Sequence, residues 1–407
     1  MTDTTIPPLL PAGTADLGPF VAAGVLDEAA IQVAGAIGRA VPATSPSVLL
    51  AAALCVRGLT QGHVCIVLAD AAATTDAEDR ARMRDDLDID PILDLPWPDP
   101  ASWAGELAAS DAVTVHDADH PQGHASTADP AVLRPLVFDG DRVYLERYWR
   151  YERQVGDLLL AQAETPDEPG SAAEAVDQVL DHLFDIEDGD EHDLQRAGAR
   201  SAIDRRLTVL AGGPGTGKTH TIARALAAIL QLVPDDGRPP EIALAAPTGK
   251  AAARMSEAIH QAVGDADLPE PIADRLRSME AQTIHRLLGW APGVAFRHDS
   301  TNPVPHDLVV VDETSMVALP LMARLLDALR PEARLVLVGD PYQLASVEAG
   351  AVLGDVVGPV RSAGPVTGPL SDSIVLLERV HRFGTDSVIA WVADARRDRD
   401  ADRAIEV

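Results

Sequence analysis

The chain has 407 residues, enough for two or three domains with hydrophobic cores. Its 33 basic and 63 acidic side chains give a net charge of −30, which excludes a protein held on DNA by overall positive charge. Two cysteines without ligand spacing exclude a disulfide scaffold and a structural zinc site. The N-terminus has no basic, apolar signal segment, and the longest apolar run, about nine residues, is too short to span a membrane. The sequence therefore predicts a cytoplasmic protein with no membrane association.

The acidic side chains are concentrated in the first half of the chain. Residues 1–200 contain 36 acidic and 12 basic side chains, whereas residues 201–407 contain 27 and 21. We interpret residues 1–160 as a separate N-terminal domain that docks partner proteins. Residues 161–193 are crowded with Asp, Glu, Ala, Pro and Gly, and this composition predicts an acidic linker. An acidic surface for a partner protein is the alternative interpretation of the same segment.

Hydrophobic spacing predicts a mixture of helices and strands in the N-terminal domain and a regular alternation after it. In the first 150 residues it favours helices over 29–37 and 47–58 and strands over 64–68 and 142–145. The later strands are expected over 207–210, 242–246, 308–311, 335–338 and 374–377, and the helices over 218–230, 251–259 and 321–329. This alternation predicts an α/β fold with a parallel sheet covered on both faces, which binds ligands at the carboxyl ends of its strands.

The segment GGPGTGKT follows the first of these later strands and opens a helix. It matches GxxxxGK[ST], in which glycines let backbone N–H groups surround phosphate oxygens at a helix N-terminus. Lys218 is expected to reach the β- and γ-phosphates of ATP, and the Thr219 hydroxyl to bind Mg²⁺. The predicted nucleotide-binding residues are Gly212, Gly213, Pro214, Gly215, Thr216, Gly217, Lys218 and Thr219.

Two further strands end in polar residues that suit phosphate chemistry. VVVDETSM places Asp312 and Glu313 at the end of a buried strand, where two carboxylates are costly unless a cation or hydrogen bonds compensate them. We expect Asp312 to hold Mg²⁺ through water, and Glu313 to orient and deprotonate the attacking water. LVLVGDPYQL places Gln343 where it would contact the γ-phosphate; a Gly–Asp turn with a surface glutamine is the alternative.

Two segments are candidates for DNA contact. APTGKAAARM places Thr248, Gly249 and Lys250 at a helix N-terminus, which suits a nucleic-acid phosphate, although a plain turn is the alternative. AQTIHRLLGW contains Thr283 and His285, which either contact single-stranded DNA or cap a helix whose leucines belong to the core. Lys218 and Lys250 are the only lysines in the chain, and both lie in such strand-to-helix loops.

Together these motifs resemble motifs I, Ia, Ib, II and III of the superfamily 1B DNA helicases, and most closely those of the RecD family. QGHVCIVL and PLVFDGDRVYLERYWRYE are similar to segments of the RecD N-terminal domain. The resemblance implies a RecA-like P-loop NTPase domain over 194–368, after a smaller mixed α+β domain. It implies that Gln195 reads adenine and that Arg382, in motif IV, contacts the γ-phosphate. A second RecA-like domain is expected to begin at 369 and to be truncated at Val407.

The resemblance also implies an activity and partners. It implies an ATP-dependent 5′→3′ helicase subunit of a helicase/nuclease (exodeoxyribonuclease V) for double-strand break repair and recombination. The expected cofactors are ATP and Mg²⁺, and the expected partners are RecB-like beta and RecC-like gamma subunits and single- and double-stranded DNA ends. A stand-alone RecD-like helicase and a nucleotide-binding structural subunit are the alternatives. With its acidic charge, the isolated chain is expected to bind single-stranded DNA with a dissociation constant of about 10⁻⁴ M or weaker.

Overall fold

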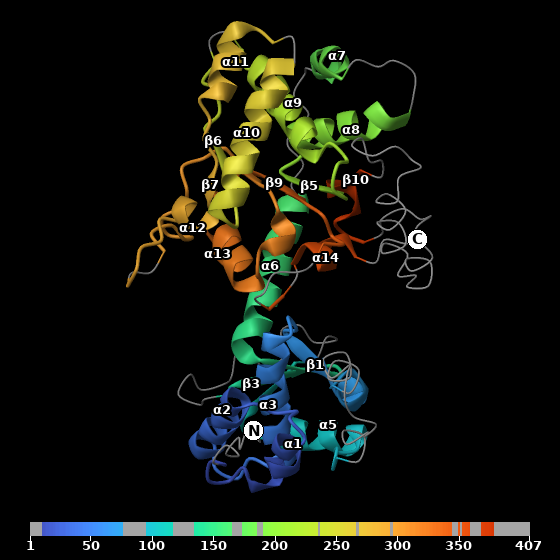
Figure 1. Ribbon diagram of the computed structural model, residues 1–407, viewed down its shortest axis with the longest axis vertical. Coiled ribbons are helices and arrows are strands. Elements are labelled where there is room, and N and C mark those ends of the chain that lie inside the picture. The colour runs from blue at the N-terminus through green and yellow to red at the C-terminus, as the bar shows by residue number, and fades with distance from the viewer. Residues whose placement is uncertain are drawn as a thin grey trace, which may run out of the picture. The chain divides into compact units, whose positions relative to one another are not determined.

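The computed structural model describes residues 10–75, 95–116, 134–164, 173–184, 190–234, 237–265, 268–293, 296–343, 349–350, 352–358 and 368–377 (Figure 1). The chain divides into two compact units. The first, here called the N-terminal domain, comprises the chain up to Arg153 together with residues 347–350. The second, here called the C-terminal domain, comprises the remainder from Gln154. The division falls within helix α6 (Glu146–Glu164), a few residues before the boundary expected at 160.

The N-terminal domain packs helices on a small sheet. The strands are β1 (Cys65–Val67), β2 (Val113–His116), β3 (Leu136–Asp139) and β4 (Arg142–Leu145), in the spatial order β1-β4-β3-β2. The β2–β3 pair is parallel, and the other two pairs are antiparallel. The helices are α1 (Gly18–Ala22), α2 (Glu28–Ala40), α3 (Pro46–Thr60) and α5 (Pro100–Ala109), with short 3₁₀ turns η1 (Ala15–Leu17) and η2 (Leu68–Asp70). The expected helices over 29–37 and 47–58 and both expected strands are confirmed.

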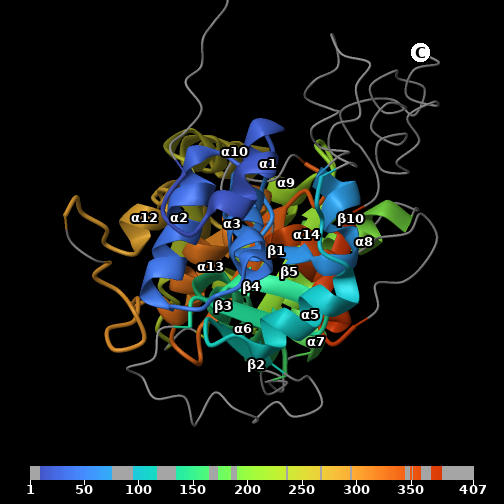
Figure 2. The same cartoon turned by 90° about the horizontal axis from the view of Figure 1, so that it is seen from below.

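Helix α3 is the centre of this domain (Figure 2). It begins with a proline, whose missing N–H is harmless in the first turn, and every residue from Val48 to Cys55 is buried. It packs against α2, α5, β1 and β4. Helix α2 is capped by Asp27, whose carboxylate accepts the Ala30 N–H at 2.8 Å. Small alanines between the large apolar side chains let these helices approach closely, as a core with few aromatics requires.

The C-terminal domain is built on six parallel strands, which confirms the predicted parallel α/β fold. They are β5 (Leu207–Gly212), β6 (Ile242–Ala246), β7 (Gln282–Thr283), β8 (Leu308–Val311), β9 (Arg334–Gly339) and β10 (Ile374–Leu377), in the order β10-β5-β9-β8-β6-β7. Every neighbouring pair in this sheet runs parallel. β5, β8 and most of β9 are fully buried, as expected for strands with helices on both faces.

Helices connect these strands. They are α7 (Ala173–Leu183), α8 (Asp190–Asp204), α9 (Lys218–Gln231), α10 (Gly249–Asp265), α11 (Glu270–Arg277), α12 (Ile284–Leu287), α13 (Leu319–Asp327) and α14 (Val352–Val357), with 3₁₀ turns η3 (Thr314–Met316) and η4 (Ser371–Ser373). α9 packs against α7, α8, α10 and α11 (Figure 1). Its inner face, with Ile222, Leu226 and Ile229, joins the main core cluster of the domain. The predicted helices over 218–230, 251–259 and 321–329 correspond to α9, α10 and α13.

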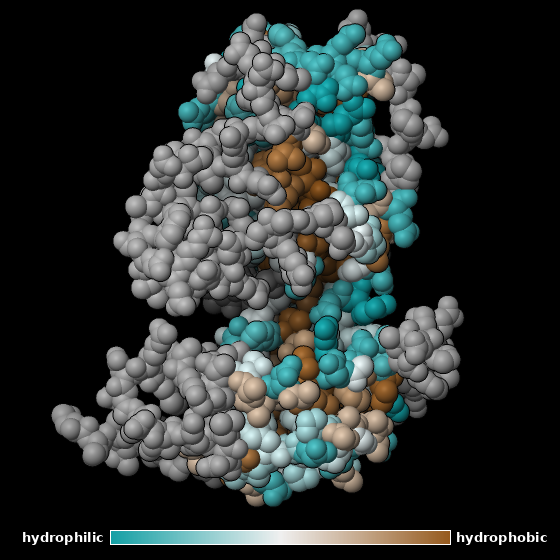
Figure 3. Space-filling view, turned by 90° about the vertical axis from the view of Figure 1, so that its right-hand side faces the viewer, coloured by the Kyte–Doolittle hydropathy of each residue, from teal (hydrophilic) through white to brown (hydrophobic). Residues whose placement is uncertain are grey.

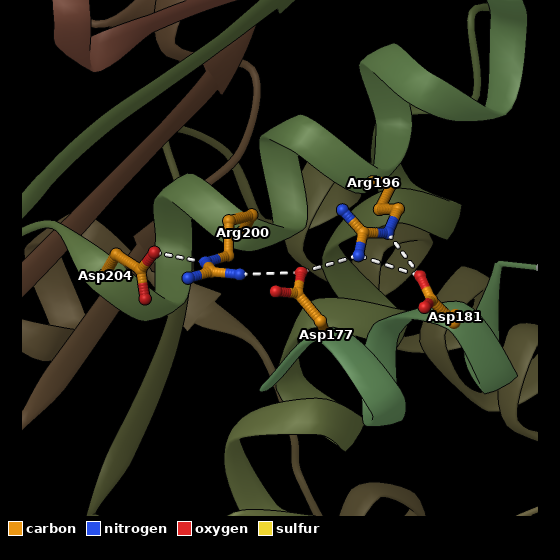
Figure 4. A network of polar contacts seen from close by, with 5 residues as sticks. All are labelled: Asp177, Asp181, Arg196, Arg200 and Asp204. Carbon is orange, nitrogen blue, oxygen red and sulfur yellow. Dashed lines mark hydrogen bonds and ion pairs between the residues drawn. The ribbon is translucent and has the colours of Figure 1, made fainter. Parts of the chain in front are cut away.

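The expected acidic linker over 161–193 is wrong for residues 173–184. These residues form α7, whose Val176, Leu180 and Leu183 recur at helical spacing and are buried in the core of the C-terminal domain. Two of its acidic side chains, Asp177 and Asp181, form a network with arginines of α8 (Figure 4). Asp177 Oδ1 accepts Arg196 Nη2 at 2.6 Å and Arg200 Nη1 at 2.8 Å. Arg196 also pairs with Asp181, and Arg200 with Asp204. The amino-acid composition predicted a linker because it reflects the number of acidic residues and not the helical spacing of the apolar residues.

Replacing Leu180 by Ala tests whether α7 is part of the folded domain. The Leu180 side chain is fully buried, so its truncation should lower the free energy of unfolding by about 2–5 kcal/mol through lost burial and a cavity. Chemical denaturation followed by circular dichroism measures this change. Gln178→Ala, at an exposed position of the same helix, is the matched control and should change the value by less than about 0.5 kcal/mol. Equal stabilities of the two variants would mean that Leu180 does not pack in the core and that α7 behaves as the linker expected from composition.

The expected start of a second RecA-like domain at 369 is also wrong for the strand that the structure describes there. β10 lies beside β5 in the same sheet, with Leu377 opposite Gly212 in register. An apolar run predicts a strand, but it does not say which sheet the strand joins. Residues 378–407, which include Arg382, lie outside the described residues.

The described surface exposes few large apolar side chains. Six of them exceed about a third exposure, among them Trp290 at 50% and Met316 at 41%. Figure 3 shows hydrophilic residues mainly along one side of the face it draws, with a band of hydrophobic residues beside them. Within the described residues, no helix combines the length and apolar character needed to cross a bilayer.

Candidate functional site

The predicted site residues follow neighbouring strands of the C-terminal sheet and meet at its carboxyl edge. Along this edge the strand order places the loop after β5 next to the ends of β9 and β8, and then the ends of β6 and β7. The glycine-rich loop therefore lies beside the acidic turns, and the DNA-contact candidates lie on the far side of those turns. Because all six strands are parallel, one edge of the sheet collects every motif.

The glycine-rich loop has the backbone that a phosphate site requires. Gly215 and Gly217 have positive φ angles of 82° and 83°, which side chains with a Cβ rarely adopt. A Cβ on Gly212 would lie 2.7 Å from the carbonyl oxygen of Leu377, so β10 leaves no room for another residue there. Thr216 is buried, and its hydroxyl donates to the Gly213 carbonyl at 2.9 Å. The loop is thus fixed before α9 begins at Lys218.

Lys218 lies inside the loop. Its ammonium donates to the carbonyl oxygens of Gly212 at 2.7 Å and Gly213 at 2.8 Å. Burial lowers the pKa of Lys218, while the nearby carboxylates of Asp340, Asp312 and Glu313 act in the opposite direction. Among the described residues, the hydrogen-bond partners of the Lys218 ammonium are these two loop carbonyls, and it is well placed to exchange them for phosphate oxygens. Thr219, the next residue, is half-buried at the start of the same helix.

Asp312 and Glu313 come directly after β8. Burial raises the pKa of Asp312, and the Glu313 carboxylate raises it further; the Glu313 N–H, 2.8 Å from Asp312 Oδ1, and Lys218 oppose the shift. Glu313 has a left-handed backbone with φ 51°, a conformation that non-glycine residues seldom adopt outside functional turns. This turn aims two adjacent carboxylates at the same edge as Lys218. Ser315 follows, with a buried hydroxyl that has no hydrogen-bond partner among the described residues.

Asp340 is a site residue that the sequence interpretation treated only as part of a turn. It is 6% exposed, follows β9, and accepts the Tyr342 N–H at 3.0 Å. Its neighbour Gly339 permits close packing, because a Cβ there would lie 3.2 Å from the backbone nitrogens of Thr314 and Ser315. The two acidic turns therefore pack tightly against each other. The signal in the sequence was the Gly–Asp pair after a buried strand beside two other motifs.

Of the other three residues predicted to contact the nucleotide, one contacts the glycine-rich loop, one has no described side-chain contact with it, and one lies outside the described residues. Gln195 is 4% exposed on α8, and its side-chain amide donates to the Thr216 carbonyl at 3.3 Å, so it contacts the glycine-rich loop. Gln343 is exposed after β9, and its N–H donates to the Asp340 carbonyl at 3.2 Å. No described contact joins the Gln343 side chain to the loop residues. Arg382 lies outside the described residues, so its expected place at the site stays a prediction.

The DNA-contact candidates lie at the ends of β6 and β7, which are paired so that Ala246 is opposite Thr283. Thr248 caps α10 by accepting the Ala251 N–H at 3.2 Å, and Gly249 and Lys250 are exposed in its first turn. Thr283 caps α12 by accepting the Arg286 N–H at 3.2 Å. Capping is thus confirmed for Thr283 and not for His285. Leu287 and Leu288 are buried as expected, and DNA contact by this segment stays a prediction. His285 is exposed and free to contact a ligand as well.

The residues present fit a nucleotide with a divalent cation. The loop supplies backbone N–H groups at a helix N-terminus, and the buried Asp312 carboxylate with its raised pKa is a group that a cation would stabilise in the ionised form. The Thr219 hydroxyl and the Asp312 carboxylate are hard oxygen ligands, as Mg²⁺ prefers. The described residues contain no cluster of three or more His, Cys, Asp or Glu side chains that would bind a metal without a nucleotide.

Comparison with known proteins gives the same division of the chain. Residues 22–144 match the sequence model of the N-terminal domain of RecBCD enzyme subunit RecD, and residues 195–349 match that of an AAA domain. The second match supports nucleotide binding by the C-terminal domain. A solved structure of the Pif1 helicase from Candida albicans shares 17% identity and covers 52% of this chain and 44% of its own, with a TM-score of 0.32 that is too low to carry an argument.

Curated relatives extend over both domains. RecBCD enzyme subunit RecD of Mycolicibacterium smegmatis is 43% identical over 388 residues, 95% of this chain and 60% of that protein. The subunit of the same name from Mycobacterium tuberculosis is 42% identical over 390 residues, 95% of this chain and 58% of that protein. The ATP-dependent RecD2 DNA helicase of Deinococcus radiodurans is 37% identical over 214 residues, 52% of this chain and 26% of that protein. The chain thus spans about 60% of the length of these RecD relatives, and it contains a match to the RecD N-terminal domain followed by a match to an AAA domain.

Proposed function

We propose that this chain is the nucleotide-driven motor part of an ATP-dependent 5′→3′ DNA helicase subunit of a RecBCD-type enzyme. The observation that carries the proposal is the order of motifs along one sheet edge. The phosphate loop after β5 and the acidic turns after β9 and β8 are followed directly by the loops after β6 and β7. The loops at the γ-phosphate position and the DNA-contact candidates therefore lie on adjacent strands. A structural change on ATP hydrolysis could pass directly from one set of loops to the other.

The residues divide the chemistry between them. Lys218 and the backbone N–H groups of the loop would bind the phosphates of ATP, and Gln195 would contact the adenine end of the site. Thr219 and Asp312 would hold Mg²⁺, which supplies positive charge against the phosphate oxygens. Glu313, next to Asp312 on the same turn, would orient the attacking water and accept its proton. Gln343 and Arg382 are proposed to contact the γ-phosphate.

DNA contact is proposed for the far end of the same edge. Lys250, exposed with Gly249 at the N-terminus of α10, offers a cation to a phosphate. Thr283 and His285 lie beside them at the end of β7. A chain of net charge −30 has no bulk attraction for a polyanion, so these local contacts must act with the rest of the protein and with partner subunits. RecB-like beta and RecC-like gamma subunits are the proposed partners, and the N-terminal domain is the proposed docking surface. A cytoplasmic location stays a prediction.

The test is ATP hydrolysis with and without single-stranded oligonucleotide, measured on the complete protein alone and with its beta and gamma subunits. Stimulation by DNA that depends on the partner subunits supports the proposed function. Stimulation of the protein alone would favour a stand-alone RecD-like helicase. ATP binding with no hydrolysis under any of these conditions would favour a structural subunit. Lys250→Ala, the matched control, should reduce the stimulation by DNA while ATP affinity stays unchanged.

A further inference from the structure

An aromatic cluster lies beyond the end of β7, where Trp290 and Phe296 have no role assigned so far and His285 is the DNA-contact candidate. Trp290 is 50% exposed, the largest exposure among the large apolar side chains of the described residues. Its ring lies 6.0 Å from that of His285, edge to face, and the Phe296 ring lies 5.8 Å from His285 on a tilted plane. These separations are those of packed aromatic pairs. His285 therefore lies in ring contact with both Trp290 and Phe296, and Trp290 is the more exposed of the two larger rings.

The backbone holds this cluster in place. Leu287 and Leu288 are buried, and they anchor the segment in the core. Gly289 reverses the chain with φ 68°, and the Trp290 N–H donates to the His285 carbonyl at 2.9 Å. A hydrogen bond also joins the two ends of this segment, because the Arg297 N–H donates to the Leu288 carbonyl at 3.0 Å. These backbone contacts therefore hold the Trp290 side chain in a position exposed to solvent.

The charge around the cluster is unusual for this chain. Residues 281–298 contain no acidic side chain, in a sequence with 63 acids in 407 residues. The same stretch supplies Arg286 and Arg297, both exposed, and the histidines His285 and His298. Aromatic faces combined with cations are the usual composition of sites that bind single-stranded nucleic acid, where bases stack on the rings and cations contact the phosphates.

We propose that Trp290, supported by His285 and Phe296, is a base-stacking site for single-stranded DNA. The proposal deepens the proposed function and rests on it, because the strand would reach the cluster from the phosphate contacts at Lys250 and Thr283. A segment without acidic residues and with two exposed arginines suits a polyanionic strand better than it suits the acidic surface of another copy of this chain. Stacking requires no particular base, so the site would favour single strands without reading sequence.

The experiment separates base stacking from phosphate contact. A fluorescence anisotropy titration measures binding of an oligo-dT strand and of an abasic strand with the same length and number of phosphates. The proteins are the wild-type complex with beta and gamma subunits, Trp290→Ala and the matched variant Trp290→Phe, which keeps an aromatic face. Trp290→Ala should weaken binding of oligo-dT by about five- to a hundredfold, the usual effect of losing one stacking ring, and leave abasic binding unchanged. Trp290→Phe should retain most of the affinity for oligo-dT.

Three results would overturn the inference. Oligo-dT affinity unchanged in Trp290→Ala would show that no base stacks there. Equal losses on both strands would mean that the ring supports the fold or the phosphate contacts. Loss of complex assembly in Trp290→Ala, seen by gel filtration, would make the cluster a protein interface. If instead the wild-type complex neither binds oligo-dT nor hydrolyses ATP in response to it, the proposed function itself fails, and this outcome is distinct from the other three.

Discussion

Replacing Lys218 by Ala should weaken ATP binding by at least about tenfold, equivalent to about 1.4 kcal/mol, and slow hydrolysis by a further factor of about 10²–10³. Lys218 is the only cation in the phosphate loop, and its ammonium is already held within the loop by the Gly212 and Gly213 carbonyls. Its loss leaves the β- and γ-phosphates with backbone donors alone. Isothermal titration calorimetry with ATP measures the first effect, and a phosphate-release assay of the complete protein measures the second.

The chain supplies its own matched control for this experiment. Lys250→Ala removes the only other lysine, which is exposed at the first turn of α10. The two variants lose the same charge from the same sheet edge, so a general electrostatic effect would weaken ATP binding in both. Only Lys218→Ala should show the loss. ATP affinity that is unchanged in Lys218→Ala would rule out the phosphate-loop assignment.

Much of the C-terminal domain was predictable because buried parallel strands leave a clear pattern. Four apolar residues in a row identified β8 and β9, and a mostly apolar run interrupted by Thr208 identified β5; each run is followed by glycine or a polar turn. Their spatial order was not predictable, since β6 follows β5 in sequence yet pairs with β8 and not with β5. That order depends on which crossover each helix makes. β7 was missed because it has only two half-buried residues, Gln282 and Thr283, and no apolar run.

The site residues that could not be predicted from the sequence were missed for a similar reason. The glycine-rich loop and the Asp312–Glu313 turn are local patterns, so each can be identified from one continuous segment of sequence. Asp340 becomes a site residue only because β9 lies between β5 and β8, where its carboxylate comes near Lys218. The aromatic cluster at Trp290 likewise depends on a reversal at Gly289 that brings Phe296 back toward His285. Contacts between segments that are distant in sequence have no signature in either segment alone.

Replacing Glu313 by Gln in the complete protein should leave ATP and Mg²⁺ binding intact and reduce hydrolysis by about 10²–10⁴-fold. The substitution keeps the size of the side chain and its left-handed backbone, but an amide cannot accept a proton from the attacking water. Asp312 keeps its carboxylate and the hydrogen bond that it accepts from the backbone N–H of residue 313, which does not depend on the side chain. The Asp312 carboxylate also loses a neighbouring negative charge that raises its pKa, which favours its ionised form.

The control for this experiment is Glu332→Gln, the same chemical change at an exposed position just before β9, at the opposite edge of the sheet. It should leave both binding and hydrolysis unchanged, which separates the role of Glu313 from the effect of removing one acid from an acidic protein. Calorimetry and phosphate release on the three proteins give the two quantities independently. A Glu313→Gln variant that lost ATP binding along with hydrolysis would place Glu313 among the groups that hold the nucleotide. Retained binding with retained hydrolysis would move the proton acceptor to another residue, and the nearby Asp340 would be the next to test, since it is the other buried carboxylate on this edge among the described residues.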